Sequence, residues 1–324
     1  MVSRRNALIG AAAAVVTALS RRTPVVLAIA SQPSTAVNFD VPAGACDCHT
    51  HIFGDPRRFP FWPERTYTPE PASVAELRTL HRALHIDRVV IVNPTVYGAD
   101  NACTLDAIKQ LGPRARGIAL IDDKTTDSQL DAMDRAGMRG IRLNFETFGV
   151  TDASAARQRF QAAVQRLAGR QWHIQINTRL SVIEALQDQV MAAPMPVVFD
   201  HFGNAQASRG FEQSGFGALL NLVQSGKAYV KISTTNRVAP ETRDYADVAL
   251  LAKALITAHS QRILWGTNWP HPNSTPLPGK TAADINPLFQ IDEGRVLNLL
   301  PLWAPDAALR KTILVDNPAR LYGF

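Results

Sequence analysis

Residues 172–190, WHIQINTRLSVIEALQDQV, show the pattern that decides the fold. The β-rich run 172–177 is followed within a few residues by a helix-like stretch at 181–190. The same order recurs along the chain without a break. We expect strands at 45–51, 88–93, 116–121, 140–144, 172–177, 196–200, 228–232 and 262–266. We expect helices at 73–84, 104–111, 127–136, 153–167, 181–190, 216–224, 244–258 and 306–313. Such a series of β-to-α units favours an α/β fold that closes into a parallel (β/α)₈ TIM barrel over an open sheet.

The composition fits one barrel-sized globular domain. The chain has 324 residues, of which 46% are hydrophobic and 19% charged, so a sizeable core can form and disorder is excluded. No apolar run reaches the eighteen residues or so that a membrane-spanning helix needs. The formal charge of +6 alone suggests a nucleic-acid partner, but no basic stripe interleaved with aromatic residues supports one.

Residues 1–30 resemble a twin-arginine-type signal peptide, followed by a leader at 31–44 and a single barrel domain at 45–324. A basic start with Arg4 and Arg5 precedes an apolar centre and the small-x-small end 28–30. Ala7 departs from the export motif, and a frayed helix or a misassigned start codon is the alternative interpretation. The segment holds four arginines and no acidic residue, so its removal leaves 30 basic against 28 acidic side chains. We therefore expect a periplasmic protein without a general basic surface.

The three cysteines, Cys46, Cys48 and Cys103, form neither a disulfide framework nor a C-x-x-C motif. Along the strand 45–51 the first two alternate with Asp47, His49 and His51. Alternation predicts that the cysteines face outward into packing, while the other three residues point into the barrel.

Histidines at the ends of two expected strands are the first candidates for chemistry. His49 and His51 are two residues apart and can converge on one metal ion or one substrate group, and His201 closes the strand 196–200. A neutral imidazole serves as a metal ligand or as a general acid or base near neutral pH. The long connections 52–72 and 268–293 should overhang the same C-terminal face of the barrel, where active sites of this fold lie.

Asn268 follows the last expected strand, in the place where a barrel hydrolase needs a base. A carboxamide has no accessible basic site, so Asn268 cannot take a proton from water. Arg142 and Arg237 lie at the ends of two other strands and suit carboxylate or sulfonate groups, whereas Arg139 has the opposite strand parity and is expected to be structural.

Four motifs give the chain a family resemblance. DCHTH at 47–51, DHFG at 200–203, GTNWPHP at 266–272 and DNPARLYGF at 316–324 resemble motifs of the amidohydrolase superfamily, of the amidohydrolase 2 type. The nearest branch is similar to the 2-pyrone-4,6-dicarboxylate lactonases. The resemblance runs from about residue 45 to residue 324. It implies a distorted (β/α)₈ barrel that opens a small anionic lactone, such as a pyrone-dicarboxylate or a muconolactone, in aromatic-compound degradation.

The resemblance also assigns roles to single residues. His49 and His51 would polarise the lactone carbonyl or hold a divalent ion, and His201 would assist at the carbonyl or stabilise the oxyanion. Asn268 stands where the family has the Asp that activates water. Family positions that hold the substrate's carboxylates and ring oxygen correspond to Tyr67, Thr95, Arg142, Arg237 and Asn273.

Two departures from the family leave alternatives open. With Asn268 the chain is an engineered substrate-trapping variant, a natural pseudo-enzyme, or an enzyme with another base. Phe148 stands where the dicarboxylate lactonase carries another Arg, which implies a substrate with a different anionic pattern.

Metal dependence is open as well. The resemblance is compatible with catalysis that needs no cofactor and with one zinc ion on His49, His51 and His201, since three histidines are a reasonable zinc set. The alternatives in function are a metal-dependent amidohydrolase or decarboxylase, a lactone isomerase, and a binding protein for carboxylates. The expected partner is the small anionic substrate. Nucleic acid and a membrane span are not expected, and the sequence does not give the oligomeric state.

Overall fold

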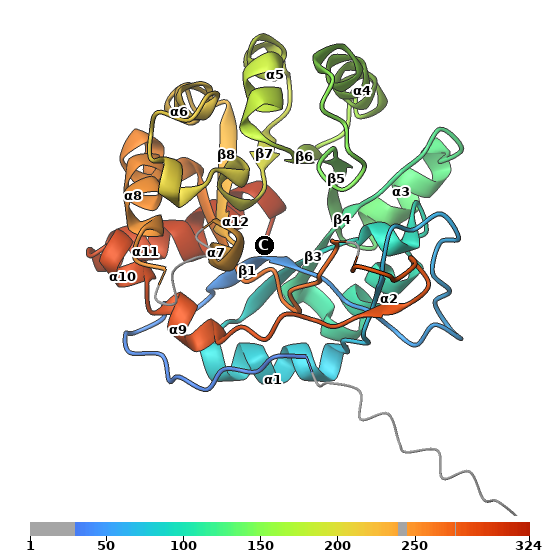
Figure 1. The fold of residues 1–324 in the computed structure, drawn as a ribbon, viewed down its shortest axis with the longest axis horizontal. Helices are drawn as coiled ribbons and strands as arrows, with labels where there is room; N and C mark the ends of the chain where they lie inside the picture. The colour runs from blue at the N-terminus through green and yellow to red at the C-terminus, as the bar shows by residue number, and fades with distance from the viewer. Residues whose placement is uncertain (1–29, 239–244, 276) are drawn as a thin grey trace, which may run out of the picture.

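A computed structural model describes residues 30–238, 245–275 and 277–324; the expected signal peptide lies outside these residues, except for Ala30. Eight parallel strands follow one another around a single sheet (Figure 1). They are β1 (Cys46–Thr50), β3 (Arg88–Val92), β4 (Ala115–Ala119), β5 (Met138–Asn144), β6 (His173–Asn177), β7 (Val197–Phe199), β8 (Ala228–Ser233) and β9 (Ile263–Gly266). All eight expected strands are present, and the predicted TIM barrel is confirmed.

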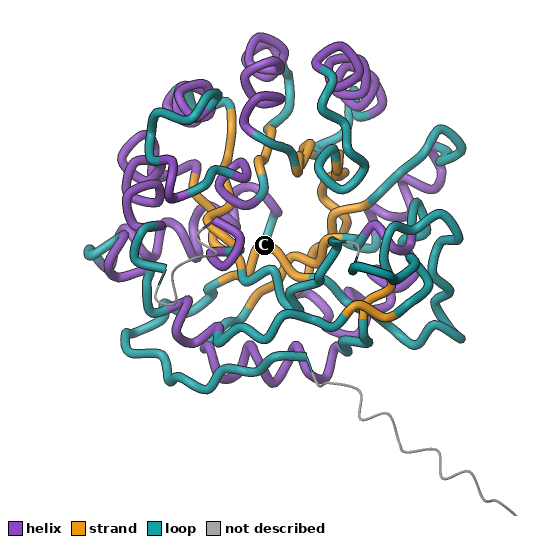
Figure 2. Tube along the Cα trace, in the orientation of Figure 1, coloured by secondary structure: helices purple, strands orange, loops and turns teal. Residues whose placement is uncertain are grey.

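Helices surround the ring of strands, as the alternation of elements requires (Figure 2). The outer helices are α1 (Val74–Leu84), α2 (Ala102–Leu111), α3 (Asp127–Arg135), α4 (Ala153–Arg166), α5 (Leu180–Ala192), α6 (Phe216–Gln224) and α8 (Val248–His259). Shorter helices are α7 (Thr235–Val238), α9 (Glu293–Leu297), α10 (Leu300–Trp303), α11 (Ala307–Lys311) and α12 (Asn317–Tyr322), with a π-helical turn at Thr312–Asp316 between the last two. No helix of the described ranges is long and apolar enough to cross a membrane.

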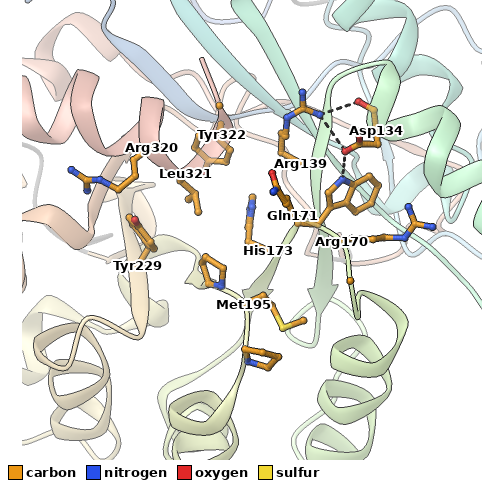
Figure 3. Close-up of a pocket in the computed structure, with 15 residues that line it drawn as sticks. Asp134, Arg139, Arg170, Gln171, His173, Met195, Tyr229, Arg320, Leu321 and Tyr322 are labelled. Atoms are coloured by element: carbon orange, nitrogen blue, oxygen red, sulfur yellow. Dashed lines mark hydrogen bonds and ion pairs between the residues drawn. The ribbon is translucent and has the colours of Figure 1, made fainter.

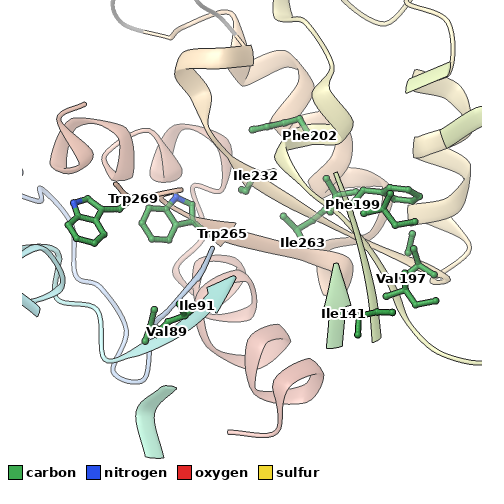
Figure 4. Packing of buried hydrophobic residues seen from close by; sticks show 14 of the residues in the cluster. Val89, Ile91, Ile141, Val197, Phe199, Phe202, Ile232, Ile263, Trp265 and Trp269 are labelled. Atoms are coloured by element: carbon green, nitrogen blue, oxygen red, sulfur yellow. The ribbon is translucent and has the colours of Figure 1, made fainter. Parts of the chain in front are cut away.

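The apolar core has two parts because successive strand residues face opposite sides. The larger part lies between the strands and the outer helices and includes Val89, Ile91 and Trp265 (Figure 4). The smaller part fills the barrel interior. Its buried members are Cys46, Cys48, Val90, Val92, Ile118, Val198, Tyr229, Leu264 and Tyr322. The C-terminal helix α12 therefore contributes to the interior packing at the end of the barrel opposite the strand C-termini.

The orientation predicted for β1 is wrong at its start. Cys46 and Cys48 face the barrel interior, whereas the Asp47 carboxylate lies 3.2 Å from His81 Nε2 of helix α1, outside the barrel. Asp47 pairs with Val89 of β3, and Thr50 pairs with Ile91. Three residue steps along β1 therefore correspond to only two along β3. This bulge shifts the alternation, so that His49 and His51 still reach the interior.

The barrel closes between β9 and β1 through hydrogen bonds beyond regular strand pairing. The Asn268 amide donates to the His49 carbonyl at 2.8 Å, and the His51 amide donates to the Trp269 carbonyl at 2.8 Å. Thr267 Oγ1 donates to Asp47 Oδ2 at 2.6 Å. The same seam therefore positions both histidines of β1 and Asn268.

The two long connections meet above the strand C-termini. They contain β2 (Thr68–Pro69) and β10 (Ile285–Asn286), which pair in parallel as a small second sheet. The leader segment is ordered and packs on the domain: Ser34 Oγ donates to Asp292 Oδ2 at 2.7 Å, and Trp269 Nε1 donates to the Ser31 carbonyl at 2.9 Å.

Candidate active site

A small cavity lies at the C-terminal ends of the strands and gathers most of the predicted site residues. It is lined by His51, Tyr67, Pro94, Thr95, Arg142, Asn144, Thr147, Asn177, His201, Arg237, Asn268, Pro272 and Ser274. Its volume is about 30 Å³.

Two of the predicted residues are not in the lining. His49 lies fully buried beside it, with its ring centre 4.5 Å from that of His201 and 5.1 Å from that of His51. Asn273 lies between the lining residues Pro272 and Ser274 but is not itself in the lining, and its Oδ1 accepts from the Thr275 amide at 3.2 Å.

Three site residues follow strand ends in a left-handed backbone conformation. His201 after β7, Thr234 after β8 and Asn268 after β9 have φ values of 53°, 61° and 66°. Non-glycine residues rarely adopt this region, which costs of order 1–3 kcal/mol at each position. The chain turns sharply at these points, and the turn directs the His201 and Asn268 side chains to the cavity.

The hydrogen bonds of His51 define which of its nitrogens is free. Its Nδ1 lies 2.8 Å from the Val92 carbonyl, which can only accept, so Nδ1 carries the hydrogen. Burial, together with the Arg142 charge, lowers the pKa of His51 to about 3. The neutral ring therefore presents a lone pair on Nε2. In this state His51 can accept a proton, whereas donation to a carbonyl, as the resemblance implied, would need the imidazolium.

His201 is held from the side opposite the cavity. Its Nδ1 lies 2.8 Å from Ser233 Oγ and 2.7 Å from Thr234 Oγ1, at the end of β8. Burial lowers the pKa of His201 well below its usual value, so the ring is neutral near pH 7. The two hydroxyls fix the ring orientation and leave Nε2 for the cavity.

Asp200 is a central residue of the site that the sequence analysis did not single out. Its Oδ2 accepts from Arg142 Nε at 2.9 Å and from Gln175 Nε2 at 3.0 Å, and its Oδ1 lies 3.2 Å from His49 Nδ1. His49 and two cationic side chains, Lys231 and Arg142, hold the pKa of Asp200 well below its usual range despite burial, which opposes this shift. The carboxylate is thus ionised and organises the residues beneath the cavity.

Lys231 was also missed, although the sequence contained a signal for it. It lies within the strand YVKIS, where its neighbours are apolar, and its side chain is fully buried. Its Nζ donates to Gln175 Oε1 at 2.6 Å and lies 3.4 Å from His49 Nδ1 and 3.5 Å from Asp200 Oδ1. A charged residue inside an apolar strand of a barrel is rarely buried without a partner or a role.

Groups suited to an anionic substrate surround the cavity. Arg142 and Arg237 both line it; Arg142 is buried, whereas Arg237 is exposed to solvent. Burial raises the pKa of Tyr67 to about 12, so its phenol keeps the proton and can donate. Phe148, at the position where the resemblance implies another arginine, is outside the lining, and its ring lies edge-on to Trp62.

A possible metal site differs from the predicted one in one member. Ligand atoms of His49, Asp200 and His201 lie within 4.8 Å of one another, with Asp200 in the place predicted for His51. In the described part of the chain this is the one such cluster. The distances alone would allow an ion to bind, but the positive charges of Arg142 and Lys231 lie beside Asp200 and oppose a cation there.

A larger hollow, of about 930 Å³, lies elsewhere among the described residues. It lies at the N-terminal ends of β5, β6 and β8 and is lined by residues that include His173, Met195, Tyr229 and Tyr322. The guanidinium groups of Arg170 and Arg320 point away from it to opposite sides (Figure 3). None of the predicted site residues lines this hollow, and the small cavity remains the candidate active site.

The chain is similar to known proteins over most of its length. The amidohydrolase family model matches residues 46–324. A 2-pyrone-4,6-dicarboxylate hydrolase of Comamonas testosteroni is 36% identical over 293 residues, which cover 88% of this chain and 92% of the relative. A 4-sulfomuconolactone hydrolase of Rhizobium radiobacter is 33% identical over 90% of this chain and 93% of the relative.

A solved structure shares the fold over nearly the whole domain. The apo crystal structure of an Agrobacterium tumefaciens protein aligns with a TM-score of 0.74 at 27% identity, over 90% of this chain and 98% of the other. The sequence and fold comparisons thus cover the barrel, the strand ends and both long connections. The chain belongs to the amidohydrolase family, in the branch that contains 2-pyrone-4,6-dicarboxylate hydrolase.

Proposed function

We propose that this protein hydrolyses the ring ester of a small lactone that carries carboxylate or sulfonate groups. One observation carries the proposal: Arg142, Arg237 and His51 line the same cavity, and Nε2 of His51 carries a free lone pair. Guanidinium groups bind planar oxyanions in a two-pronged manner, and the neutral His51 imidazole, a weak base at a pKa of about 3, is the group placed to accept a proton from water.

His51 provides the alternative to the missing aspartate. In the proposed reaction its Nε2 takes a proton from water as the water oxygen bonds to the lactone carbonyl carbon. The Asn268 amide and His201 face the same cavity and stabilise the negative charge on the carbonyl oxygen. The tetrahedral intermediate then breaks its bond to the ring oxygen, which receives the proton from His51. The product is the open hydroxy acid.

The named relatives support this class of substrate. One is named for a pyrone with two carboxylates, and the other for a muconolactone with a sulfonate. Here Phe148 removes one of the arginines implied by the resemblance, and its ring lies outside the cavity. We therefore propose a substrate with fewer anionic contacts than the dicarboxylate, such as a muconolactone with one carboxylate and one further acid group.

The decisive experiment is turnover of a panel of carboxylated and sulfonated lactones in water enriched in oxygen-18. Wild-type protein should incorporate one labelled oxygen into the ring-opened acid. His51→Gln should lower kcat by about 100-fold or more, the usual contribution of a general base. Asn268→Asp should raise kcat by about 10-fold or more, because a carboxylate can share the work of the base. When His51→Gln is combined with Asn268→Asp, the fall in kcat caused by His51→Gln should be smaller than in the wild type.

Each rival function predicts another product. A lactone isomerase would give an isomeric ring without labelled oxygen, a decarboxylase would release carbon dioxide, and a carboxylate-binding protein would bind without turnover even as Asn268→Asp. If neither the wild type nor Asn268→Asp opens any lactone of the panel, lactone hydrolysis is wrong. An unchanged rate in His51→Gln would remove His51 from the role of base.

We also propose export to the periplasm by residues 1–30. The twin arginines at positions 4 and 5 support this assignment. Cleavage after Ala30 would retain the contact between Trp269 and the Ser31 carbonyl. Fractionation of cells should yield a periplasmic protein that begins at Ser31, and replacement of Arg4 and Arg5 by Lys should leave the full-length chain in the cytoplasm. A wild-type chain that stays full-length and cytoplasmic would contradict export.

A further inference from the structure

The charges around the possible metal site are unusual for a site that holds a divalent ion. Asp200 is the single carboxylate of the cluster, and two cationic side chains already contact it, Arg142 at 2.9 Å and Lys231 at 3.5 Å. Zinc sites attract the ion through anionic or neutral ligands that are free to coordinate it. Here the one negative charge is balanced before any ion arrives.

The position of the Lys231 ammonium makes the conflict specific. Its Nζ lies 3.4 Å from His49 Nδ1 and 3.5 Å from Asp200 Oδ1, and both residues belong to the cluster. A zinc ion bonded to these atoms would lie about 2 Å from each, which would leave it against the ammonium in a buried space. Repulsion between like charges at such a separation is strong in a low-dielectric interior.

We propose that Lys231 is a built-in cation that takes the place of a divalent metal ion in this barrel, and that its removal creates a zinc site from His49, Asp200 and His201. In this arrangement Lys231 is a positioning residue. It donates to Gln175 Oε1 and lies 3.5 Å from Asp200 Oδ1 and 3.4 Å from His49 Nδ1. The His49 Nε2 atom is buried without a hydrogen-bond partner among the described residues.

The strand position matters as much as the charge, because Lys231 and Ile232 point to opposite sides of β8 and only the former reaches the interior. An apolar side chain of similar length at 231 would therefore remove the charge and leave the strand packing in place.

The test is metal binding by the full barrel in the absence of substrate. Zinc content after dialysis and cobalt titration followed by visible absorption are measured for wild type, Lys231→Met, Lys231→Arg and Lys253→Met. Lys253 is an exposed lysine of α8 and serves as the matched control. We expect wild type, Lys231→Arg and Lys253→Met to retain less than stoichiometric zinc. Lys231→Met should bind zinc at least about 10-fold more tightly and give the visible bands of tetrahedral cobalt.

Two results would overturn the proposal. Stoichiometric zinc in the wild type, removed by chelator with a change in thermal stability, would show that the ammonium does not exclude the ion. A folded Lys231→Met that binds zinc no better than the wild type would show that the cluster is not a latent site. Lys231→Gln provides a second neutral variant if Lys231→Met fails to fold by circular dichroism. None of these measurements depends on lactone turnover, so a failure of the proposed function remains distinguishable.

Discussion

Arg142 and Arg237 both face the cavity, but their surroundings give them different roles. Arg142 Nε binds Asp200, so this side chain supports the buried network as well as the cavity wall. Partial desolvation of its guanidinium lowers the pKa of Arg237, and the carboxylate of Glu146 partly offsets this effect. Arg237 is therefore the better candidate for a residue whose main role is to bind an anionic group of the substrate.

This difference can be measured at the level of the single residue. Arg237→Gln should raise KM for an anionic lactone by about 10- to 100-fold, the value of one charge-assisted hydrogen bond, with a smaller change in kcat. Arg142→Gln should lower kcat as well, because Asp200 loses a partner. A lactone in which the acid group is replaced by a neutral amide should lose this dependence on Arg237. Equal effects of Arg237→Gln on charged and neutral lactones would contradict a role in anion binding.

Single residues also mark the limit of what the sequence could predict. His51, His201, Arg237 and Asn268 follow strand ends, and Arg142 lies near the end of β5. Parallel strands of a barrel bring their C-terminal ends together, so the convergence of these residues was predictable. The hydrogen position on His51 depends on the Val92 carbonyl, and the turn at Asn273 depends on Thr275. Both follow from local geometry that residue types and spacing do not determine.

At the level of elements, the seam between β9 and β1 connects packing to the site. Gly266 ends β9, and a Cβ atom there would lie 2.8 Å from the His49 backbone nitrogen and 2.9 Å from His49 Cβ. This close approach allows the Asn268 amide to reach the His49 carbonyl. The glycine is therefore required by the distance between the two strands.

Gly266→Ala should destabilise the protein by about 1–3 kcal/mol, the usual effect of overpacking, and should lower kcat because His49 and Asn268 are displaced. Gly217→Ala is the matched control, since Gly217 is in helix α6 and nothing lies within 4 Å of its added Cβ. That variant should be unchanged or more stable by up to about 1 kcal/mol. Urea unfolding and initial rates check both variants. A Gly266→Ala protein with wild-type stability and rate would show that the seam can widen freely.

The same elements show why the fold was more predictable than its details. Each strand and outer helix leaves a local signal in β-rich or helix-like runs, and all eight strands were predicted within a few residues of their ends. The bulge in β1 leaves no such signal, because it depends on the register with β3. As a result the side-chain directions of Asp47, Cys46 and Cys48 were predicted wrongly, although the strand itself was correct.

For the whole molecule, the two ends of the barrel differ in what their buried histidines do. His51 faces the active-site cavity, whereas His173 lies at the start of β6 with its ring 5.4 Å from that of Tyr322. Neither ring nitrogen of His173 has a hydrogen-bond partner among the described residues. Burial lowers the pKa of His51, His173 and His271 to about 3 in each case.

These histidines make the folded state sensitive to acid. In the unfolded chain a histidine titrates near pH 6.5, so between about pH 6.5 and 3 the unfolded state binds a proton that the folded state does not. The free energy of unfolding must then fall as the pH falls through this window, by up to about 1.4 kcal/mol per pH unit for each such histidine. The stability that depends on their neutral form is fully present above pH 6.5 and is lost progressively toward pH 3.

His173→Met isolates one of these contributions, because methionine fits a buried apolar space and does not titrate. Urea unfolding at pH 7 and pH 5 should show a smaller loss of stability in the variant than in the wild type. The difference should be about 1–2 kcal/mol if His173 titrates as its burial requires. Activity at pH 7 should be unchanged, since His173 is at the opposite end of the barrel from the cavity. An equal pH dependence of unfolding in the two proteins would mean that His173 is already protonated in the folded state, with a compensating anion beside it.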